Sequence, residues 1–511
     1  MHAMPLSQLL EVVPGAEVRG EPGLEVSGVE CDTRRLKRGM LFVAVRGRRE
    51  DGHRYLQQAI VAGASAVLSA EPSRDRAAGL TWVRVPDERE ALARLARRFH
   101  GEPDLRLSLV GVTGTKGKTT TAWLIESMVE AAGGRPGGIG TVRVRVGAES
   151  WPAGLTTPDA PTVCALLARM VSEGCTHAVM EVSSQALDQR RVDALRFRCA
   201  VFTNLAQDHL DYHGTMDAYL EAKARLFRAL DPEAVAILPA DDPAAVRLAG
   251  LTRACVVAYD GSAHSAGAPA CSGPAPEVWI ESAQLSLEGT TAVLRTPQGR
   301  MEVATPLVGR HNLRNLAAAA AAALALGLPP SAVVAGAAAV QPVPGRMERV
   351  DEGQPFLVLV DYAHTEDALR RVLESLRELT RGRILCVFGC GGDRDPGKRA
   401  PMGAAAAALA EVLFITSDNP RGEDPMAIIR EIERGVRSVT PRRPYRLQPD
   451  RQRSIAAALA EARPGDAVLI AGKGHEREQI IGAARRPFDD REQARQALRA
   501  LASRGAAEAG R

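Results

Sequence analysis

The chain has 511 residues, of which 45% are hydrophobic and 25% charged, and this composition excludes a disordered or fibrous protein. At roughly 100–200 residues per domain, the length predicts about three domains. Its 65 basic and 61 acidic residues leave a scattered net charge of +4, so nucleic acid is not an expected partner. The sequence contains no run of about 18 apolar residues and does not begin like a secretory signal, so we expect a cytoplasmic protein without a membrane span.

The spacing of the cysteines and the small number of lysines indicate which kinds of functional site to expect. The eight cysteines form no Cys-x-x-Cys pair, so neither a zinc site nor a disulfide scaffold is predicted, and Cys386 and Cys390 are interpreted as small buried hydrophobic residues. Only six basic residues are lysines, against 59 arginines. An ammonium is a compact charge that can lose its proton and a guanidinium is not, so lysines are expected where arginine cannot act. Chance retention is an even alternative for Lys37, whereas the other five lysines fall within motifs.

Short apolar segments alternate with helical patterns along the chain, which is typical of α/β proteins with parallel sheets. Alanine-rich segments at 317–325 and 404–410 are expected to be closely packed helices, and 263–276 a mobile surface loop. Boundaries near Pro103 and in the Pro- and Gly-rich stretch 341–345 predict domains at 1–105, 106–340 and 341–511. Because ligands in open α/β sheets bind beyond the carboxyl ends of the strands, the loops after the strands are expected to hold the functional site. The predicted strands are 107–112, 177–182, 199–203, 234–238, 356–360, 384–388, 412–416 and 467–471.

The motif TGTKGKTT follows the first of these strands and precedes a helical pattern, as a phosphate-binding loop requires. Gly114 and Gly117 would let backbone N–H groups point at phosphate oxygens, and the helix N-terminus adds its positive end. Lys118 is expected at the β- and γ-phosphates and Thr119 at Mg²⁺. One departure from the strict motif is Val112, where glycine is usual. The sequence therefore predicts ATP binding by Gly114, Thr115, Lys116, Gly117, Lys118, Thr119 and Thr120.

A second group of polar residues follows the next strands. Mg²⁺ prefers oxygen ligands, so Glu181 and Thr119 suit it, whereas His209 is a less typical nitrogen ligand. His213 is interpreted as a hydrogen-bonded loop residue. Lys223 lies on a predicted helix near this group, and its amine could react with CO₂ to give an anionic carbamate.

Ten motifs together resemble the Mur ligase family, and most closely those members that add the third residue of the peptidoglycan stem peptide. The resemblance covers nearly the whole chain. It implies an N-terminal domain for the UDP-substrate, a central ATP-binding domain with a P-loop ATPase-like parallel sheet, and a C-terminal Rossmann-like domain for the amino acid. It also implies a monomeric ATP-dependent ligase of cell wall biogenesis, and thereby of cell shape, cell division and the cell cycle. The motifs, in chain order, are TGTKGKTT, EVSS, TNLAQDHLDYHG, EAKARLF, GRHNLRNLAAA, PGRMERV, DYAHTEDAL, FGCGGDRD, SDNPRGEDP and AGKGHE.

The resemblance also implies individual roles. Lys223 matches a carbamylated lysine, and Gln185 and Glu366 depart from the family pattern, where histidine and proline are usual. The implied catalytic residues are Lys118, Lys223, His209 and Glu181, and the implied metal ligands are Thr119, Glu181 and His209. The implied residues near the adenosine are Asn312, Arg346 and Asp361. The implied UDP-substrate residues are Thr33, Gly47, Thr156, Thr157, Ser183, Gln189 and Arg191.

The incoming amino acid is indicated by the motif DNPR, which is similar to the signature of ligases that add meso-diaminopimelate. By this resemblance Arg421 and Arg394 would face the distal carboxylate of the substrate, and Gly472 and Glu476 would hold its distal ammonium. Lysine as substrate has no such carboxylate, so a buried guanidinium would be left unpaired. The implied amino-acid-binding residues are Arg394, Asp418, Asn419, Pro420, Arg421, Gly472 and Glu476.

The expected reaction converts the D-glutamyl carboxylate of UDP-N-acetylmuramoyl-L-alanyl-D-glutamate to an acyl phosphate, which the amine of diaminopimelate then attacks. Mg²⁺ and Lys118 would neutralise charge on the transferred phosphoryl group. Three alternatives stay open. The same ligase could use L-lysine, or the chain could be a folylpolyglutamate synthetase-like ligase. A P-loop nucleotide switch would hydrolyse ATP without an amine acceptor.

Overall fold

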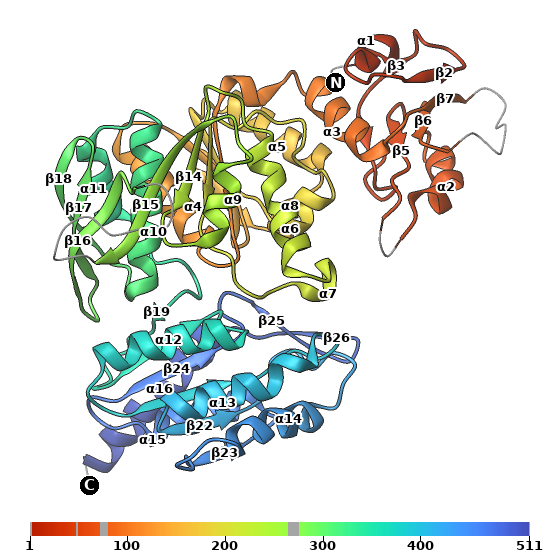
Figure 1. The fold of residues 1–511 in the computed structure, drawn as a ribbon. Helices are drawn as coiled ribbons and strands as arrows, with labels where there is room; N and C mark the ends of the chain where they lie inside the picture. The colour runs from red at the N-terminus through yellow and green to blue at the C-terminus, as the bar shows by residue number, and fades with distance from the viewer. Residues whose placement is uncertain (1–2, 48–49, 72–79, 264–274, 510–511) are drawn as a thin grey trace. The chain divides into compact units, whose positions relative to one another are not determined.

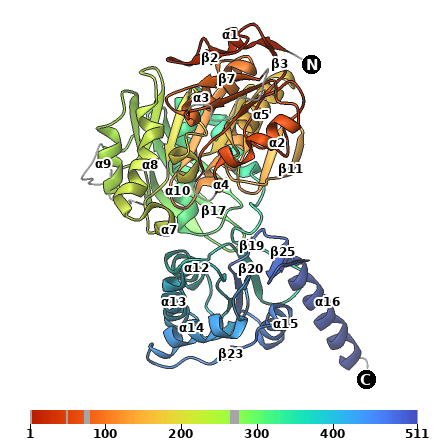
Figure 2. The same cartoon turned by 90° about the vertical axis from the view of Figure 1, so that its right-hand side faces the viewer.

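The computed structural model describes residues 3–47, 50–71, 80–263 and 275–509, and it contains two compact units (Figures 1 and 2). Among the helices described, none combines the length and the apolar composition that a membrane crossing needs. The loop predicted at 263–276 lies mostly outside the described residues. The first unit comprises Met1–Trp279, Arg295–Met301 and Asn315–Ala337, and the second comprises Ile280–Leu294, Glu302–Arg314 and Ala338–Arg511.

The N-terminal part of the first unit contains a five-stranded sheet in the order β2-β7-β6-β5-β4. β2 pairs with β7 antiparallel, and the other neighbours are parallel. The side chain of Asp87 caps helix α3 by accepting hydrogen bonds from two backbone N–H groups of its first turn. The elements are β1 Met4–Pro5, α1 Leu6–Leu10, β2 Glu17–Arg19, β3 Glu25–Val26, β4 Val29–Glu30, β5 Leu41–Val43, the 3₁₀ turn Gly52–Tyr55, α2 Leu56–Val61, β6 Ala66–Ser69, β7 Thr81–Arg84 and α3 Glu88–Phe99.

A larger sheet in the same unit contains strands in the order β11-β10-β9-β12-β8-β13-β14-β15. Strands β9, β12, β8, β13, β14 and β15, which are neighbours in this order, are parallel to one another. β10 pairs antiparallel with β9, and β11 pairs antiparallel with β10. The strands are β8 Ser108–Thr113, β9 Pro136–Ile139, β10 Arg143–Val146, β11 Glu149–Pro152, β12 His177–Glu181, β13 Cys199–Phe202, β14 Val235–Pro239 and β15 Cys255–Ala263. The helices are α4 Lys118–Ala131, α5 Ala160–Ser172, α6 Ser184–Asp188, α7 Leu210–His213, α8 Met216–Arg228, α9 Pro243–Ala249, α10 Arg310–Ala325 and α11 Pro330–Ala339. Residues 310–314 of α10 and 338–339 of α11 belong to the second unit.

Register brings three loops to one edge of this sheet. Val112 in the central strand β8 lies opposite Glu181 of β12 on one side and Val201 of β13 on the other. The carboxyl ends of these parallel strands therefore meet, and the segments that follow them share one edge. β13 is buried along its whole length, which explains why its sequence is a continuous apolar run. The four strands predicted here are confirmed to within one residue, and the alanine-rich segment 317–325 is confirmed as part of α10.

The second unit contains a sheet in the order β19-β20-β24-β21-β22-β23, parallel except for β19. One hydrophobic core lies between this sheet and helices α12, α13 and α14, and a second lies between the sheet and helices α15 and α16. Helices therefore cover both faces of the sheet. The strands of this unit are β19 Glu348–Arg349, β20 Leu357–Asp361, β21 Ile384–Phe388, β22 Val412–Ile415, β23 Tyr445–Leu447, β24 Ala467–Ala471, β25 Glu478–Ile481 and β26 Ala484–Pro487. Three further strands contain residues of both units: β16 Val278–Leu285, β17 Thr290–Thr296 and β18 Gly299–Thr305. The helices are α12 Glu366–Leu379, α13 Arg399–Leu409, α14 Pro425–Arg437, α15 Arg451–Glu461 and α16 Asp490–Ala509.

The four strands predicted in this unit are confirmed to within one residue, and the alanine-rich segment 404–410 forms most of the second half of α13. Cys386 and Cys390 are buried as predicted, and burial raises the pKa of the Cys390 thiol to about 12. Both residues therefore contribute as apolar groups.

An ion pair between two completely buried side chains connects α15 to α16. Arg451 donates from Nε and Nη2 to the two carboxylate oxygens of Asp490, each at 2.7 Å. The same guanidinium donates to the carbonyl oxygens of Ser417 at 3.3 Å and Ala471 at 2.9 Å. These two residues lie at the carboxyl ends of β22 and β24, so the pair holds the ends of two strands against the C-terminal helix.

Candidate functional site

The predicted phosphate loop connects β8 to α4, and α4 begins at Lys118. Gly114 has φ +143°, and a Cβ there would lie 1.9 Å from the hydroxyl of Thr203. Gly117 has φ +88°, and its Cβ would lie 2.4 Å from Oδ1 of Asn315. Only glycine fits these two positions. The ammonium of Lys118 donates to the carbonyl oxygens of Gly114 at 2.9 Å and Thr115 at 3.0 Å, so this charge lies within the turn of the loop.

The segment after β13 packs against the phosphate loop. The N–H of Lys116 donates to Oδ1 of Asn204 at 3.0 Å, and the hydroxyl of Thr203 donates to the carbonyl oxygen of Lys116 at 2.6 Å. The Lys116 ammonium forms an ion pair with Asp208 at 3.0 Å. The TNLAQDH motif therefore positions the phosphate loop through both backbone and side chains, a role for Asp208 that sequence reasoning missed.

Glu181, at the end of β12, is almost completely buried, and its side chain accepts hydrogen bonds from neutral donors of the described residues. The hydroxyl of Thr119 donates to Oε2 at 2.9 Å, and Thr141 donates its N–H to Oε1 at 2.7 Å and its hydroxyl to Oε2 at 2.9 Å. Within the described part of the chain, no cationic side chain pairs with Glu181. A buried carboxylate without a counter-charge is costly, so this oxygen-rich position favours a bound cation.

Lys223 projects from α8 to the same loop. Its side chain is 1% exposed, and Nζ donates to the carbonyl oxygen of Gly114 at 2.9 Å and lies 4.3 Å from the centre of the Tyr219 ring. Burial, assisted by the nearby charge of Lys118, lowers the pKa of Lys223 well below its ordinary value. A neutral amine is the form that reacts with CO₂, so the environment favours the predicted carbamate chemistry.

His209 stands immediately before α7 with φ +54°, and its ring is 6.2 Å from that of Tyr219. Partial burial lowers the pKa of His209, which favours the neutral imidazole. The described residues contain no group of three or more His, Cys, Asp and Glu side chains suited to a metal ion. Nε2 of His213 lies 2.9 Å from the hydroxyl of Ser184, so the hydrogen bond predicted for His213 is confirmed. His213 is the last residue of α7, however, and not a loop residue as predicted.

Most of the predicted UDP-substrate residues form one network beside Glu181. Thr157 donates its hydroxyl to the Glu181 carbonyl oxygen at 2.8 Å and accepts the N–H of Ser183 at 3.0 Å. Arg191 donates to the carbonyl oxygen of Thr157 at 2.6 Å and to Oε1 of Gln189 at 2.8 Å. The hydroxyl of Thr156 lies 3.1 Å from that of Thr141, which joins it to the same group.

Two residues of this predicted set lie in the five-stranded sheet region. The hydroxyl of Thr33 donates to Oε1 of Gln58 at 3.3 Å, and Gly47 donates its N–H to the carbonyl oxygen of Glu50 at 2.8 Å. Nearby, His53 lies 2.6 Å from Oδ1 of Asp51 through Nδ1 and 2.7 Å from the hydroxyl of Ser69 through Nε2. Ser69 is completely buried, so this chain of contacts orients the loop rather than exposing a nucleophile.

In the second unit, Arg421 follows β22 with φ +51°. Its Nη1 donates to the carbonyl oxygen of Gly392 at 2.8 Å, and it has no carboxylate partner among the described residues. Arg394 is exposed and donates to the carbonyl oxygen of its neighbour Asp393. Gly391 lies between the two arginines, because a Cβ there would be 2.8 Å from Arg421 Nη1 and 3.7 Å from Arg394 Cγ. The Arg421 guanidinium and the aliphatic part of the Arg394 side chain therefore both lie next to Gly391.

The other predicted amino-acid-binding residues surround the same loop. Asp418, Asn419 and Pro420 are buried, and Gln479 donates to the carbonyl oxygen of Asp418 at 2.9 Å. Gly472 has φ +115°, and a Cβ there would lie 2.7 Å from Oδ2 of Asp418. Asn419 donates from Nδ2 to Oε2 of Glu476 at 2.8 Å. The structure thus gathers all seven predicted residues in the loops after β21, β22 and β24.

The three residues predicted near the adenosine also lie in the second unit. Asp361, the last residue of β20, accepts the N–H of Met347 at 2.8 Å, and the guanidinium of Arg346 lies 4.7 Å from the Tyr362 ring. Asn312 donates to the carbonyl oxygen of Val308 at 2.8 Å. Of the two departures from the family pattern, Gln185 accepts from the neighbouring Ser184 hydroxyl at 3.3 Å, and Glu366 begins α12 and pairs with Arg370 at 2.6 Å.

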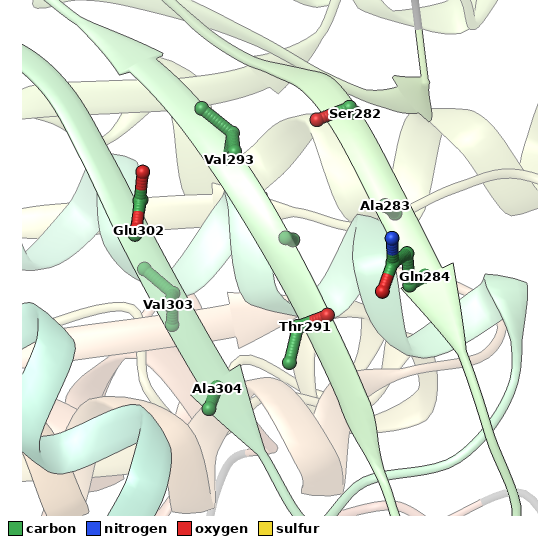
Figure 3. Close-up of a pocket in the computed structure, with 9 residues that line it drawn as sticks. Ser282, Ala283, Gln284, Thr291, Val293, Glu302, Val303 and Ala304 are labelled. Carbon is green, nitrogen blue, oxygen red and sulfur yellow. The ribbon is translucent and has the colours of Figure 1, made fainter.

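A hollow of about 390 Å³ lies on the strands β16, β17 and β18 (Figure 3). None of the predicted site residues lines it. Its polar side chains Ser282, Gln284, Thr291 and Glu302 are exposed and alternate with more buried residues along each strand. This alternation is typical of a solvated sheet face, and the hollow is separate from the loops that hold the predicted sites.

Comparison with known proteins gives matches over nearly the whole chain. Residues 112–323 match the Mur ligase middle domain, residues 345–474 the Mur ligase glutamate ligase domain, and residues 25–100 the catalytic domain of the Mur ligase family. The chain is 43% identical to the UDP-N-acetylmuramoyl-L-alanyl-D-glutamate--2,6-diaminopimelate ligase of Geobacter metallireducens, covering 98% of this chain and 100% of that protein. It is 45% identical to the protein of the same name from Gloeobacter violaceus, covering 99% and 100%.

Solved structures of other proteins have the same fold as this chain. A structure named for the same 2,6-diaminopimelate ligase is 32% identical, with a TM-score of 0.67, and covers 98% of this chain and 99% of that chain. A Mycobacterium tuberculosis folylpolyglutamate synthase complexed with ADP shares the fold at 21% identity, with a TM-score of 0.59 over 74% of this chain and 90% of that chain. With three family domains matched in order, and relatives above 40% identity along its length, the chain belongs to the Mur ligase family.

Proposed function

We propose that this chain is an ATP-dependent ligase of peptidoglycan synthesis that joins meso-diaminopimelate to UDP-N-acetylmuramoyl-L-alanyl-D-glutamate, forming ADP and phosphate. The observation that carries the proposal is Arg421, a partly buried guanidinium without a carboxylate partner among the described residues. A guanidinium pairs best with a carboxylate in a bidentate arrangement. Diaminopimelate carries a distal carboxylate and lysine does not, and the full-length relatives are named for diaminopimelate.

We assign the UDP-substrate to residues 1–105, ATP to residues 106–340 and the amino acid to residues 341–511. The phosphate loop at the start of α4 supports the second assignment, and the loops around Arg421 support the third. Asn312, Arg346 and Asp361 are proposed to contact the adenosine. Thr33, Gly47, Thr156, Thr157, Ser183, Gln189 and Arg191 are proposed to hold the UDP-substrate.

The proposed reaction has two steps. The D-glutamyl carboxylate first attacks the γ-phosphorus of ATP, which gives an acyl phosphate and ADP. The neutral amine of diaminopimelate then attacks the acyl carbon, and the tetrahedral intermediate expels phosphate. Lys118 would stabilise charge on the transferred phosphoryl group, because positioning and electrostatics dominate phosphoryl transfer. Water must be excluded from the acyl phosphate, so we expect a conformational closure during turnover.

Mg²⁺ fits the position between Thr119 and Glu181, because both supply oxygen donors and the buried carboxylate has no cationic partner among the described residues. We propose these two residues as ligands, with His209 a third candidate in the adjacent loop. Bound Mg²⁺ would polarise the phosphate oxygens of ATP. The family resemblance also assigns Lys223 a carbamate, and the buried, low-pKa amine beside the phosphate loop is compatible with that modification.

Replacing Glu181 with glutamine is expected to raise the Mg²⁺ concentration for half-maximal activity by about tenfold or more, because the amide removes the negative charge that offsets the cation. The measurement is ligation rate against Mg²⁺ concentration at saturating ATP. Glu173→Gln changes an exposed carboxylate just after α5 and serves as the matched control. An unchanged Mg²⁺ curve for the Glu181 variant would exclude Glu181 as a ligand.

The proposed function is tested by phosphate release from ATP with UDP-N-acetylmuramoyl-L-alanyl-D-glutamate present, adding meso-diaminopimelate or L-lysine in parallel. We expect release with diaminopimelate alone. Release with lysine alone would keep the ligase but reject the proposed role of Arg421. Release that needs no amine would instead support a nucleotide hydrolase.

A further inference from the structure

Lys473 lies in the loop after β24, and its side chain is completely buried. Its Nζ donates to Oδ1 of Asn419 at 3.1 Å, to Oε2 of Glu476 at 3.1 Å and to the carbonyl oxygen of Glu478 at 2.6 Å. An ammonium has three N–H donors, so these contacts use all of them. The acceptors come from the loop after β22, the loop after β24 and the first residue of β25. Lys473 therefore joins the continuous segment 473–478 to the loop after β22.

Arginine could not make the same set of contacts. Its N–H donors lie in one plane at the end of a longer side chain, whereas the three acceptors here surround a single nitrogen atom. The chain has 59 arginines and only six lysines, so a lysine is retained at a position that needs a compact ammonium. The charge is also matched locally, because Glu476 supplies a carboxylate 3.1 Å away.

These contacts fix the orientation of Asn419 and Glu476. Oδ1 of Asn419 also accepts the N–H of Ile480 at 3.0 Å, and Nδ2 donates to Oε2 of Glu476 at 2.8 Å. Oε2 of Glu476 thus receives two hydrogen bonds, whereas Oε1 has no hydrogen-bond partner within the described residues. The Glu476 side chain is 32% exposed. One carboxylate oxygen is therefore held by the protein and the other is available to a ligand.

We propose that Lys473 is a positioning residue for the incoming amino acid, acting through Glu476 and Asn419. It holds the Glu476 carboxylate so that the available oxygen can accept a hydrogen bond from the distal ammonium of diaminopimelate. This inference rests on the proposed function, which gives Glu476 that ligand. Lys473 does not touch the amino acid itself, and it acts by fixing the groups that do before the amino acid binds.

The test replaces Lys473 with methionine, which keeps the length of the side chain but removes the three donors. We expect the KM for meso-diaminopimelate to rise about 30-fold, in the range typical of losing an orienting partner, while the KM values for ATP and the UDP-substrate change less than about twofold. Lys37→Met makes the same chemical change at an exposed position and is the control. Lys473→Arg should behave like the methionine variant, although it keeps the charge.

A double-mutant comparison separates positioning from general stability. In a Glu476→Gln background, Lys473→Met should raise the diaminopimelate KM by less than about threefold, because the group through which it acts is already altered. An equal rise in both backgrounds, or an unchanged KM in a folded Lys473→Met protein, would overturn the proposal. If that variant fails to unfold cooperatively on heating, Lys473→Gln replaces it in both backgrounds and is judged by the same criteria. Failure of the unmodified protein to use diaminopimelate would instead overturn the proposed function.

Discussion

Replacing Lys223 with alanine is expected to reduce kcat for ligation about a thousandfold, which corresponds to about 4 kcal/mol of activation free energy. The Lys223 amine is buried against the phosphate loop, and its low pKa leaves it able to react with CO₂. The carbamate so formed would add two oxygens that share one negative charge next to the phosphate loop. Alanine removes them, so charge on the transferred phosphoryl group would be less well balanced. The measurement is phosphate release at saturating substrates.

Two further variants distinguish the effect of losing the carbamate from the effect of losing side-chain packing at position 223. Lys223→Met keeps most of the buried volume, and Lys223→Arg carries a cation that cannot form a carbamate, so both should be as inactive as the alanine variant. Short carboxylates such as acetate should restore part of the activity of Lys223→Ala by occupying the vacated space. Thermal unfolding checks that the proteins are folded. Full activity of Lys223→Ala without added carboxylate would reject the role.

Replacing Arg421 with alanine is expected to raise the KM for meso-diaminopimelate about 100-fold, equal to about 2.7 kcal/mol, with little change in the KM for ATP. The reason is that Arg421 has no carboxylate partner of its own among the described residues, whereas the substrate offers one. Lysine at this position should not restore binding, because a single ammonium cannot form the bidentate pair. Initial rates over a range of diaminopimelate concentrations give the measurement.

An exposed arginine provides the control for this second experiment. Arg434→Ala removes a guanidinium from the surface of α14 and should leave every KM unchanged. Arg394→Ala should have a smaller effect than Arg421→Ala, because Arg394 is exposed and its interaction is more strongly screened by water. A donor KM that stays constant in Arg421→Ala would show that Arg421 does not recognise the amino acid.

The strands that hold the sites could be predicted from sequence because they are buried on both faces. β21, for example, is a run of five buried residues bounded by polar and glycine-rich segments, and it was predicted with its observed bounds. The phosphate loop was equally clear, since its glycines, its lysine and its strand and helix context all agree. Both the apolar runs and the phosphate-loop motif are formed by residues close together in the chain, so they can be recognised in a single sequence.

Other features depend on contacts between distant segments. β9 has the sequence PGGI, which resembles a turn, yet Gly137 and Gly138 allow the strand to pass close to Met170 and Glu126. Missing this strand also hid Thr141, which follows it and donates two hydrogen bonds to Glu181. The rarity of lysine was a signal for Lys473, but Asn419, one of its three acceptors, becomes its neighbour only in the folded chain.

If the proposed amino-acid-binding residues are correct, the buried pair between Arg451 and Asp490 links the C-terminal helix to the loops that select the substrate. Asp490 is the first residue of α16, and Arg451 also contacts the carbonyl oxygens of Ser417 and Ala471, which directly precede Asp418 and Gly472 in the amino-acid-binding loops. Proteolytic removal of α16 would take away both Asp490, the counter-charge of Arg451, and the apolar residues that α16 contributes to the core shared with α15. We therefore expect the trimmed enzyme to bind the amino acid more weakly, whereas the phosphate loop, in the other unit, should still bind nucleotide.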